Sequence, residues 1–147
     1  MGAKSDAVYA LVKRLRAQGV PINGVGLQTH LDTQYGFPHE MQQNMQRFAD
    51  LGLKVALTEV DVRTTLPVTS TEQLAQSADY SQSLQACLLV RQCISYTVWG
   101  FGDAFSWVPS VFAGEGAADI YDKNLQPKPE YYALQQDLIL AGGAPHR

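Results

Sequence analysis

Apolar residues recur along the chain at spacings that alternate between helix and strand. The opening segment has a helical period, set by Val8, Leu11, Val12 and Leu15. Ser5 or Asp6 can cap the start of this helix, and Gly19 can end it. Residues 22–31, INGVGLQTHL, then predict a buried strand whose tip becomes polar.

The same alternation continues through the middle of the chain. A second amphipathic helix is predicted by Met41, Met45, Phe48 and Ala49. It ends near Gly52, and residues 54–63, KVALTEVDVR, form the second predicted strand. A third helix begins with a capping box made by Ser70 and Gln73. One face of this helix is expected to carry Leu74, Ala78, Ser81, Leu84 and Leu88.

The pattern closes with residues 94–101, ISYTVWGF, as a third strand, and with a last helix that opens at Pro129. Strands that are apolar on both faces and separated by helices predict an α/β fold with a parallel sheet. Polar and aromatic residues collect at the carboxyl end of each strand, where parallel α/β folds build their sites. A complete barrel needs about 250 residues. The chain is therefore either a small open α/β domain or part of something larger.

Composition narrows the functional classes. Apolar residues make up 46% and charged residues 17% of the 147 residues, so a packed core is expected. With a net charge of −3 and no long basic run, the chain is not expected to bind nucleic acid. No apolar run is long enough for a membrane helix, and the N-terminus lacks the pattern of a signal peptide. His39 and His146 have no metal-ligand spacing, so no metal is expected. The sequence also lacks a phosphate-binding glycine loop and a nucleotide fingerprint, so no cofactor is expected.

The two cysteines, Cys87 and Cys93, leave two alternatives open. On one continuous helix they would lie about 9 Å apart along the axis, too far for a disulfide. If the helix ends between them, near Arg91, the chain can turn back and close a small disulfide. Two buried free thiols are the alternative. A disulfide would place the parent protein outside the cytoplasm.

The second strand ends in two carboxylates, Glu59 and Asp61, which share one face because side chains alternate with period two. Two like charges so close raise the pKa of one of them unless a hydrogen-bond donor lies between. His30, at the tip of the first strand, is the natural donor. The alternatives are a solvated carboxylate and a structural histidine.

Four segments in order resemble the C-terminal part of glycoside hydrolase family 10, which consists mostly of secreted endo-1,4-β-xylanases on a (β/α)8 TIM barrel. They are GVGLQTHL, VALTEVDVR, CLLVRQCISYTVWGFGDAFSWVPSVF and GEGAADIYDKNLQPKPEYYAL. The resemblance covers nearly the whole chain. It implies that residues 1–147 are a partial barrel, with strands six to eight and their flanking helices.

The resemblance also implies roles for individual residues. Glu59 matches the nucleophile of a retaining glycosidase, with His30 hydrogen-bonded to it and Asp61 orienting the other ring nitrogen. Gln28 matches a residue near the sugar subsites, and a polar plug at the barrel mouth is its alternative role. Trp99 and Trp107 match tryptophans that wall the subsite at the scissile bond, although a packing role is the common one. Of the two alternatives for the cysteines, the disulfide between Cys87 and Cys93 is the one that we expect. Xylan or xylo-oligosaccharides are the implied ligands.

The family's acid/base glutamate has no match in the sequence. Glu40, Glu72 and Glu130 all fall in helix first turns, where the helix dipole favours negative charge without any catalytic role. Glu115, in a GEG turn, is expected at the surface. The chain alone is therefore expected to show little xylanase activity. Exposed sheet edges predict self-association or pairing with the missing N-terminal part of the barrel. A non-catalytic xylan-binding or structural half-barrel module is the alternative function.

Overall fold

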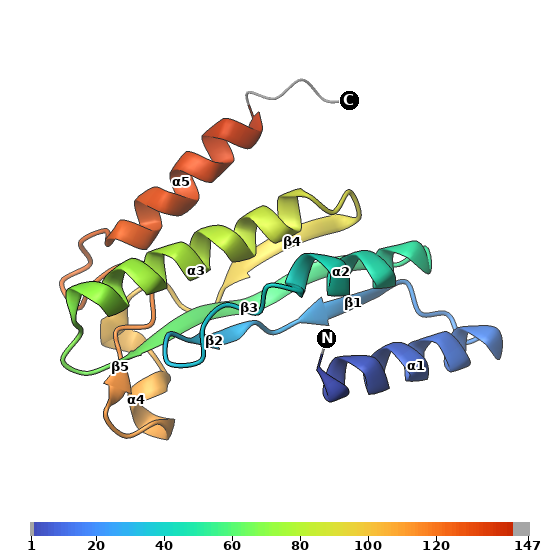
Figure 1. Ribbon diagram of the computed structural model, residues 1–147, viewed down its shortest axis with the longest axis horizontal. Helices are drawn as coiled ribbons and strands as arrows, with labels where there is room; N and C mark the ends of the chain where they lie inside the picture. Colours follow the sequence, from blue (N-terminus) through green and yellow to red (C-terminus); the bar gives the residue numbers. More distant parts are fainter. Residues whose placement is uncertain (1, 143–147) are drawn as a thin grey trace.

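The computed structural model describes residues 2–142, which form a small parallel sheet with helices along it (Figure 1). In chain order the elements are α1 (Ala3–Ala17), β1 (Gly24–Leu27), β2 (His30–Asp32), α2 (Met41–Asp50), β3 (Lys54–Thr65), α3 (Ser70–Leu88), β4 (Cys93–Val98), the 3-10 helix η1 (Asp103–Phe105), α4 (Val108–Val111), β5 (Glu115–Gly116) and α5 (Pro129–Gly142).

The long strand β3 is the centre of the sheet. Strands β1, β2 and β4 all pair with it in parallel, whereas the two-residue β5 pairs with its end in the antiparallel direction. Helices α2 and α3 lie along the sheet, and α5 lies against α3 on the side away from it (Figure 1). The predicted α/β fold with parallel strands is confirmed.

The first strand differs from its prediction in two ways. One buried strand was expected over residues 22–31, but the chain forms β1 and β2, separated by Gln28 and Thr29. Thr29 has a φ of 70°, a left-handed conformation that a regular strand does not accommodate. In addition, β1 is only partly buried, because within residues 2–142 it pairs with β3 alone and its outer edge is left open.

The apolar core lies between the sheet and the helices. β3 contributes Val55 and Leu57 from its first half and Val60 and Val62 from its second half, all nearly inaccessible to solvent. The buried positions therefore change from odd to even numbers partway along the strand. The pairing of β3 with β4 shifts register between Leu57 and Val60, which accounts for the change. Consequently Glu59 and Asp61 lie on the face opposite the core.

Two predicted helix starts are wrong by a few residues. Helix α1 begins at Ala3, and neither Ser5 nor Asp6 caps it. Their side chains instead bind α2, where the Ser5 hydroxyl accepts a hydrogen bond from Asn44 and Asp6 pairs with Arg47. Tertiary contacts to the neighbouring helix have replaced local capping.

Helix α3 carries the second error. Its capping box is formed by Thr69 and Glu72, one residue before the predicted pair. The predicted apolar face is also wrong, since Leu74 is 73% exposed and Leu88 is 44% exposed. The buried residues of the helix are Gln76, Asp79, Tyr80, Ser83, Leu84, Ala86 and Cys87.

The buried face of α3 is partly polar, and two of its side chains satisfy backbone groups of neighbouring segments. The Gln76 amide donates 2.6 Å and 2.5 Å hydrogen bonds to the carbonyls of Val62 and Ala117. The Tyr80 hydroxyl donates a 2.7 Å hydrogen bond to the Ala118 carbonyl. Buried polar groups need such partners, and these polar side chains interrupt the apolar period of the helix.

The disulfide alternative for the two cysteines is confirmed. Helix α3 ends at Leu88, and the chain turns back so that Cys93 begins β4. The two Cα atoms are 5.4 Å apart and the sulfur atoms are bonded. The disulfide therefore fixes the end of α3 to the start of β4.

Candidate active site

The carboxyl ends of the strands meet at Glu59. Its backbone N–H donates a 3.1 Å hydrogen bond to the carbonyl of Gln28, at the tip of β1. On the other side, the backbone N–H of Trp99, just after β4, donates a 2.9 Å hydrogen bond to the carbonyl of Val60. The backbone around Glu59 is thus held from both neighbouring strands, which gives its side chain a rigid support.

His30 lies between the two carboxylates of β3. Its Nε2 is 3.1 Å from Oε2 of Glu59, and its Nδ1 is 3.0 Å from Oδ1 of Asp61. An ionised carboxylate can only accept hydrogen bonds. Each ring nitrogen of His30 that carries hydrogen can therefore donate to the carboxylate that it faces. The structure thus brings together the three residues for which the sequence predicted a common site.

Trp107 belongs to the same cluster. Its indole Nε1 donates a 2.7 Å hydrogen bond to Oδ2 of Asp61. Its ring also packs edge-on against the His30 imidazole, with the ring centroids 5.1 Å apart. The sequence placed Trp107 near the site as a sugar-contacting residue but gave no signal for the hydrogen bond, because the two partners are 46 positions apart and Trp107 lies in a loop.

Burial dominates the electrostatics of Asp61, which is 1% exposed. Removal from water raises the pKa of this carboxyl group. The hydrogen bonds from Trp107 and His30, together with the positive charges of His30 and Arg63, act in the opposite direction on that pKa. Both oxygens of Asp61 are engaged, one by His30 and one by Trp107, so Asp61 has no oxygen free for another partner.

Glu59 differs from Asp61 in exposure. Its side chain is 24% exposed, so the carboxylate remains accessible from the open face of the sheet. Gln28 is exposed beside it. Trp99 is 46% exposed and is joined to the site through its backbone. The arrangement is a fixed, partly accessible carboxylate with aromatic rings nearby, which is suited to attack on a carbon centre and to stacking on a flat apolar face.

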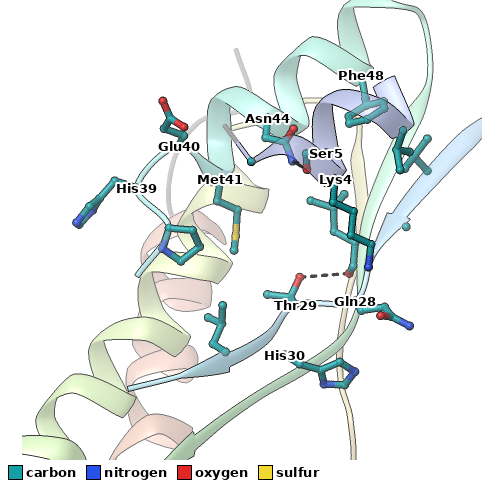
Figure 2. A pocket seen from close by; sticks show the side chains of 17 residues that line it. Lys4, Ser5, Gln28, Thr29, His30, His39, Glu40, Met41, Asn44 and Phe48 are labelled. Carbon is teal, nitrogen blue, oxygen red and sulfur yellow. Dashed lines mark hydrogen bonds between the residues drawn. The ribbon is translucent and has the colours of Figure 1, made fainter. Parts of the chain in front are cut away.

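A groove of about 810 Å³ opens beside the site, between α1, α2 and β1 (Figure 2). His30 and Gln28 lie at one end of it, and Phe48 lies near the other (Figure 2). Glu59, Asp61 and Trp107 do not line it. The groove therefore runs beside β1, and the carboxylate of Glu59 does not line it.

The remaining acidic and histidine residues take other positions. Glu72 and Glu130 lie in helix first turns as predicted, whereas Glu40 is the residue that immediately precedes α2. Glu130 is fully buried and pairs with Lys128 at 2.8 Å. Glu115 was expected at the surface, but its side chain is only 19% exposed and pairs with Arg63. His146 lies outside the described residues.

Among residues 2–142, no group of three or more histidine, cysteine or acidic residues is placed to hold a metal ion. In the same part of the chain, every helix is too short or too polar to cross a bilayer.

The cluster of Glu59, His30 and Asp61 lies at the carboxyl ends of parallel strands, which is where α/β barrels build their active sites. The family model of glycosyl hydrolase family 10 matches residues 1–137. The chain therefore belongs to this family.

Individual relatives agree with the family match. The chain is 48% identical over 133 residues to an endo-1,4-beta-xylanase of Agaricus bisporus, covering 90% of this chain and 40% of the relative. It is 40% identical over 144 residues to endo-1,4-beta-xylanase D of Talaromyces funiculosus, covering 97% of this chain and 35% of the relative.

A solved structure shows the same arrangement of elements. Xylanase 10B from Thermotoga petrophila RKU-1, in complex with xylobiose, superposes with a TM-score of 0.90 at 37% identity. The superposition covers 95% of this chain and 43% of that one. The chain thus spans roughly two fifths or less of the length of these relatives.

Proposed function

We propose that this chain is part of the catalytic barrel of a retaining endo-1,4-β-xylanase and that Glu59 is its nucleophile. The observation that carries the proposal is the position of Glu59 at the meeting point of the strand tips, with Oε2 3.1 Å from Nε2 of His30. In this assignment α1 follows barrel strand five, β1 and β2 together are strand six, β3 is strand seven and β4 is strand eight.

In the proposed reaction, a carboxylate oxygen of Glu59 attacks the anomeric carbon of a xylosyl unit while the bond to the leaving oxygen breaks. Water then hydrolyses the glycosyl–enzyme ester and restores the configuration. His30 donates its Nε2–H to Glu59 and holds the carboxylate in a fixed orientation. Asp61 accepts from Nδ1 and so keeps the ring in that orientation. Trp99 and Trp107 offer ring faces and edges for the sugar, and Gln28 offers an amide for its hydroxyl groups.

Retaining glycosidases need a second carboxyl group about 5–5.5 Å from the nucleophile to protonate the leaving oxygen. Asp61 is the carboxylate next to Glu59, but it is buried and both its oxygens are engaged. The acid/base residue is therefore proposed to come from a part of the parent barrel outside this chain. Loss of general acid/base assistance commonly costs about 10²–10⁴-fold in rate. The chain alone is expected to release little reducing sugar from xylan.

The parent enzyme is proposed to be secreted, and the Cys87–Cys93 disulfide supports this location, since disulfides persist in oxidising compartments. A non-catalytic xylan-binding module is the second candidate, favoured by the exposure of Trp99. Titration with xylohexaose, followed by tryptophan fluorescence in the wild type and in Trp99→Phe, tests ligand binding under both hypotheses.

Covalent labelling of Glu59 by an activated fluoroglycoside separates the two functions, because only a nucleophile forms the ester. Saturable binding of xylohexaose without labelling favours the binding module. Labelling of Glu59 favours the enzyme fragment. Robust hydrolysis of xylan by the pure 147-residue chain would contradict the proposal that the acid/base residue lies outside it.

A further inference from the structure

Arg63 follows the catalytic candidates on the same face of β3. In the parallel register of β2 and β3, His30 lies opposite Asp61 and Asp32 lies opposite Arg63. Because side chains two positions apart share a strand face, the Asp32–Arg63 pair is the next pair along from His30–Asp61. The Arg63 side chain is 15% exposed, so this second pair is largely withdrawn from water.

The guanidinium of Arg63 is held by two carboxylates. Its Nη2 is 2.9 Å from Oδ2 of Asp32, and its Nε donates to Oε2 of Glu115. Glu115 belongs to β5, which is joined to the loop after β4, so Arg63 connects the end of the central strand to that loop. The planar guanidinium is well suited to hold two carboxylates in a fixed geometry.

One face of the guanidinium carries an aromatic ring. The Cζ atom of Arg63 lies 4.1 Å from the centroid of the Phe112 ring, a cation–π contact. Phe112 packs edge-on against Trp107, with the centroids 5.7 Å apart. Trp107 in turn donates its hydrogen bond to Asp61 and packs on His30. A continuous series of contacts thus runs from Arg63 through two aromatic rings to the cluster around Glu59.

We propose that Arg63 is a positioning residue that fixes the Trp107 indole against Asp61 and His30 by anchoring Phe112. It acts through other residues and does not touch substrate. The catalytic consequence rests on the proposed function, but the positioning of Trp107 does not. Without the guanidinium, Phe112 loses the contact beneath its ring, and the 2.7 Å bond from Trp107 to Asp61 loosens.

The test uses indole N–H signals in the ¹⁵N spectrum of the full chain, which contains two tryptophans. Trp99→Phe assigns the Trp107 signal. In Arg63→Met, the Trp107 indole signal is expected to move and its hydrogen exchange to accelerate roughly tenfold, because the exchange rate reports local opening. Arg63→Lys, which keeps the charge but not the planar fork, should lie between Arg63→Met and the wild type.

Arg47 offers a matched control remote from Glu59. It pairs with Asp6 at 2.6 Å, lies 4.9 Å from the Tyr9 ring centroid and has a side chain that is 18% exposed. Arg47→Met therefore removes a comparable ion pair and cation–π contact, and the Trp107 signal should stay in place. An unchanged Trp107 signal in Arg63→Met, or equal changes in Arg47→Met, would overturn the proposal.

Phe112→Leu is a second variant, for use if Arg63→Met does not fold, because it removes the ring contact and keeps the ion pairs of Arg63. It is expected to shift the Trp107 indole signal and to accelerate its hydrogen exchange as in Arg63→Met. An unchanged Trp107 signal in Phe112→Leu overturns the proposal. Covalent labelling of Glu59 should slow roughly 10- to 100-fold in Arg63→Met, since small displacements of catalytic groups have effects of this size. If the wild type is not labelled at all, the proposed function fails, while the indole signals still decide the role of Arg63.

Discussion

The imidazole of His30 and the carboxylate of Asp61 lie opposite each other in the register of β2 and β3, with Nδ1 3.0 Å from Oδ1. Strands β2 and β3 are therefore joined both by their backbone pairing and by this side-chain contact. The ring is fixed at Nδ1 by a buried partner, and its Nε2 is directed at Glu59. The contact therefore links the stability of the sheet to the orientation of the proposed nucleophile.

Replacement of His30 tests this link. His30→Ala leaves Oδ1 of the buried Asp61 without its partner, which typically costs about 1–3 kcal/mol. The free energy of unfolding from urea denaturation is expected to fall by an amount in this range. His39→Ala is the control, because His39 is exposed in a loop and its removal should change stability by less than about 0.5 kcal/mol. Equal losses of unfolding free energy in His30→Ala and His39→Ala would contradict the prediction that the contact of His30 with Asp61 stabilises the fold.

Reduction of the disulfide tests the contribution of the covalent link between α3 and β4. The two cysteines are 6 positions apart, so the closed loop is short. For a loop of this size the loss of chain entropy in the unfolded state corresponds to about 2 kcal/mol. The Cys87→Ser/Cys93→Ser double variant is expected to unfold at correspondingly lower urea concentration, and reducing agent should lower the stability of the wild type but not that of the variant. Equal stability with and without reductant would contradict the prediction.

The dependence of stability on pH reports on Asp119, which is 1% exposed. Burial, together with the negative charges of Asp103 and Asp61, raises the pKa of this carboxyl group to about 7, although Lys128 opposes the shift. A raised pKa means that the folded state binds the proton more tightly than the unfolded state. The stability from Asp119 is therefore present at acidic pH and is lost as the pH rises from about 4 to about 7.

Asp119→Asn removes this titration. The variant should show a smaller loss of unfolding free energy between pH 5 and pH 8 than the wild type, by urea denaturation at both values. Asp122→Asn provides a control of opposite sign, because the backbone N–H of Gln126 lowers the pKa of Asp122. Asp122 is ionised in both the folded and the unfolded state between pH 5 and pH 8, so its removal should leave the loss of stability over this range unchanged. An identical pH slope in the wild type and Asp119→Asn would contradict the assignment.

The open edges of the sheet predict self-association. Within residues 2–142, β1 and β4 each pair with β3 alone, and Ile94 on β4 is 66% exposed. Unpaired strand edges with apolar side chains favour pairing with another chain. Sedimentation velocity is expected to show a dimer or larger species, and Ile94→Lys should shift it toward the monomer. Ile139→Lys, at a position 67% exposed on α5, should not. A monodisperse wild-type monomer would contradict this prediction.

Much of the fold could be predicted from local patterns. The second strand and the last helix follow directly from an apolar run and from Pro129, and β4 follows from the apolar run that begins near Cys93. These features depend on a few neighbouring residues and on intrinsic backbone preferences. For the same reason the grouping of His30, Glu59 and Asp61 could be anticipated once parallel strands were assigned, because parallel strand tips meet at one edge.

The features that the sequence did not indicate depend on contacts between distant segments. Gln76 and Tyr80 are buried on α3 because they donate hydrogen bonds to backbone carbonyls of other segments. The shift of register after Leu57 changes which side of β3 is buried, and regular alternation cannot anticipate it. The hydrogen bond from Trp107 to Asp61 likewise requires the folded loop.

The central proposal is that Glu59 is a nucleophile toward a xylosyl carbon. A 2-deoxy-2-fluoro-xylobioside with a dinitrophenolate leaving group needs no acid catalyst for its departure, so it reports on the nucleophile alone. After incubation at high reagent concentration, mass spectrometry of the digested chain should find one glycosyl ester, on the peptide that contains Glu59. Glu59→Gln should abolish the adduct and Glu115→Gln should retain it. A folded chain that remains unlabelled, or carries the sugar on a different carboxylate, would contradict the proposal.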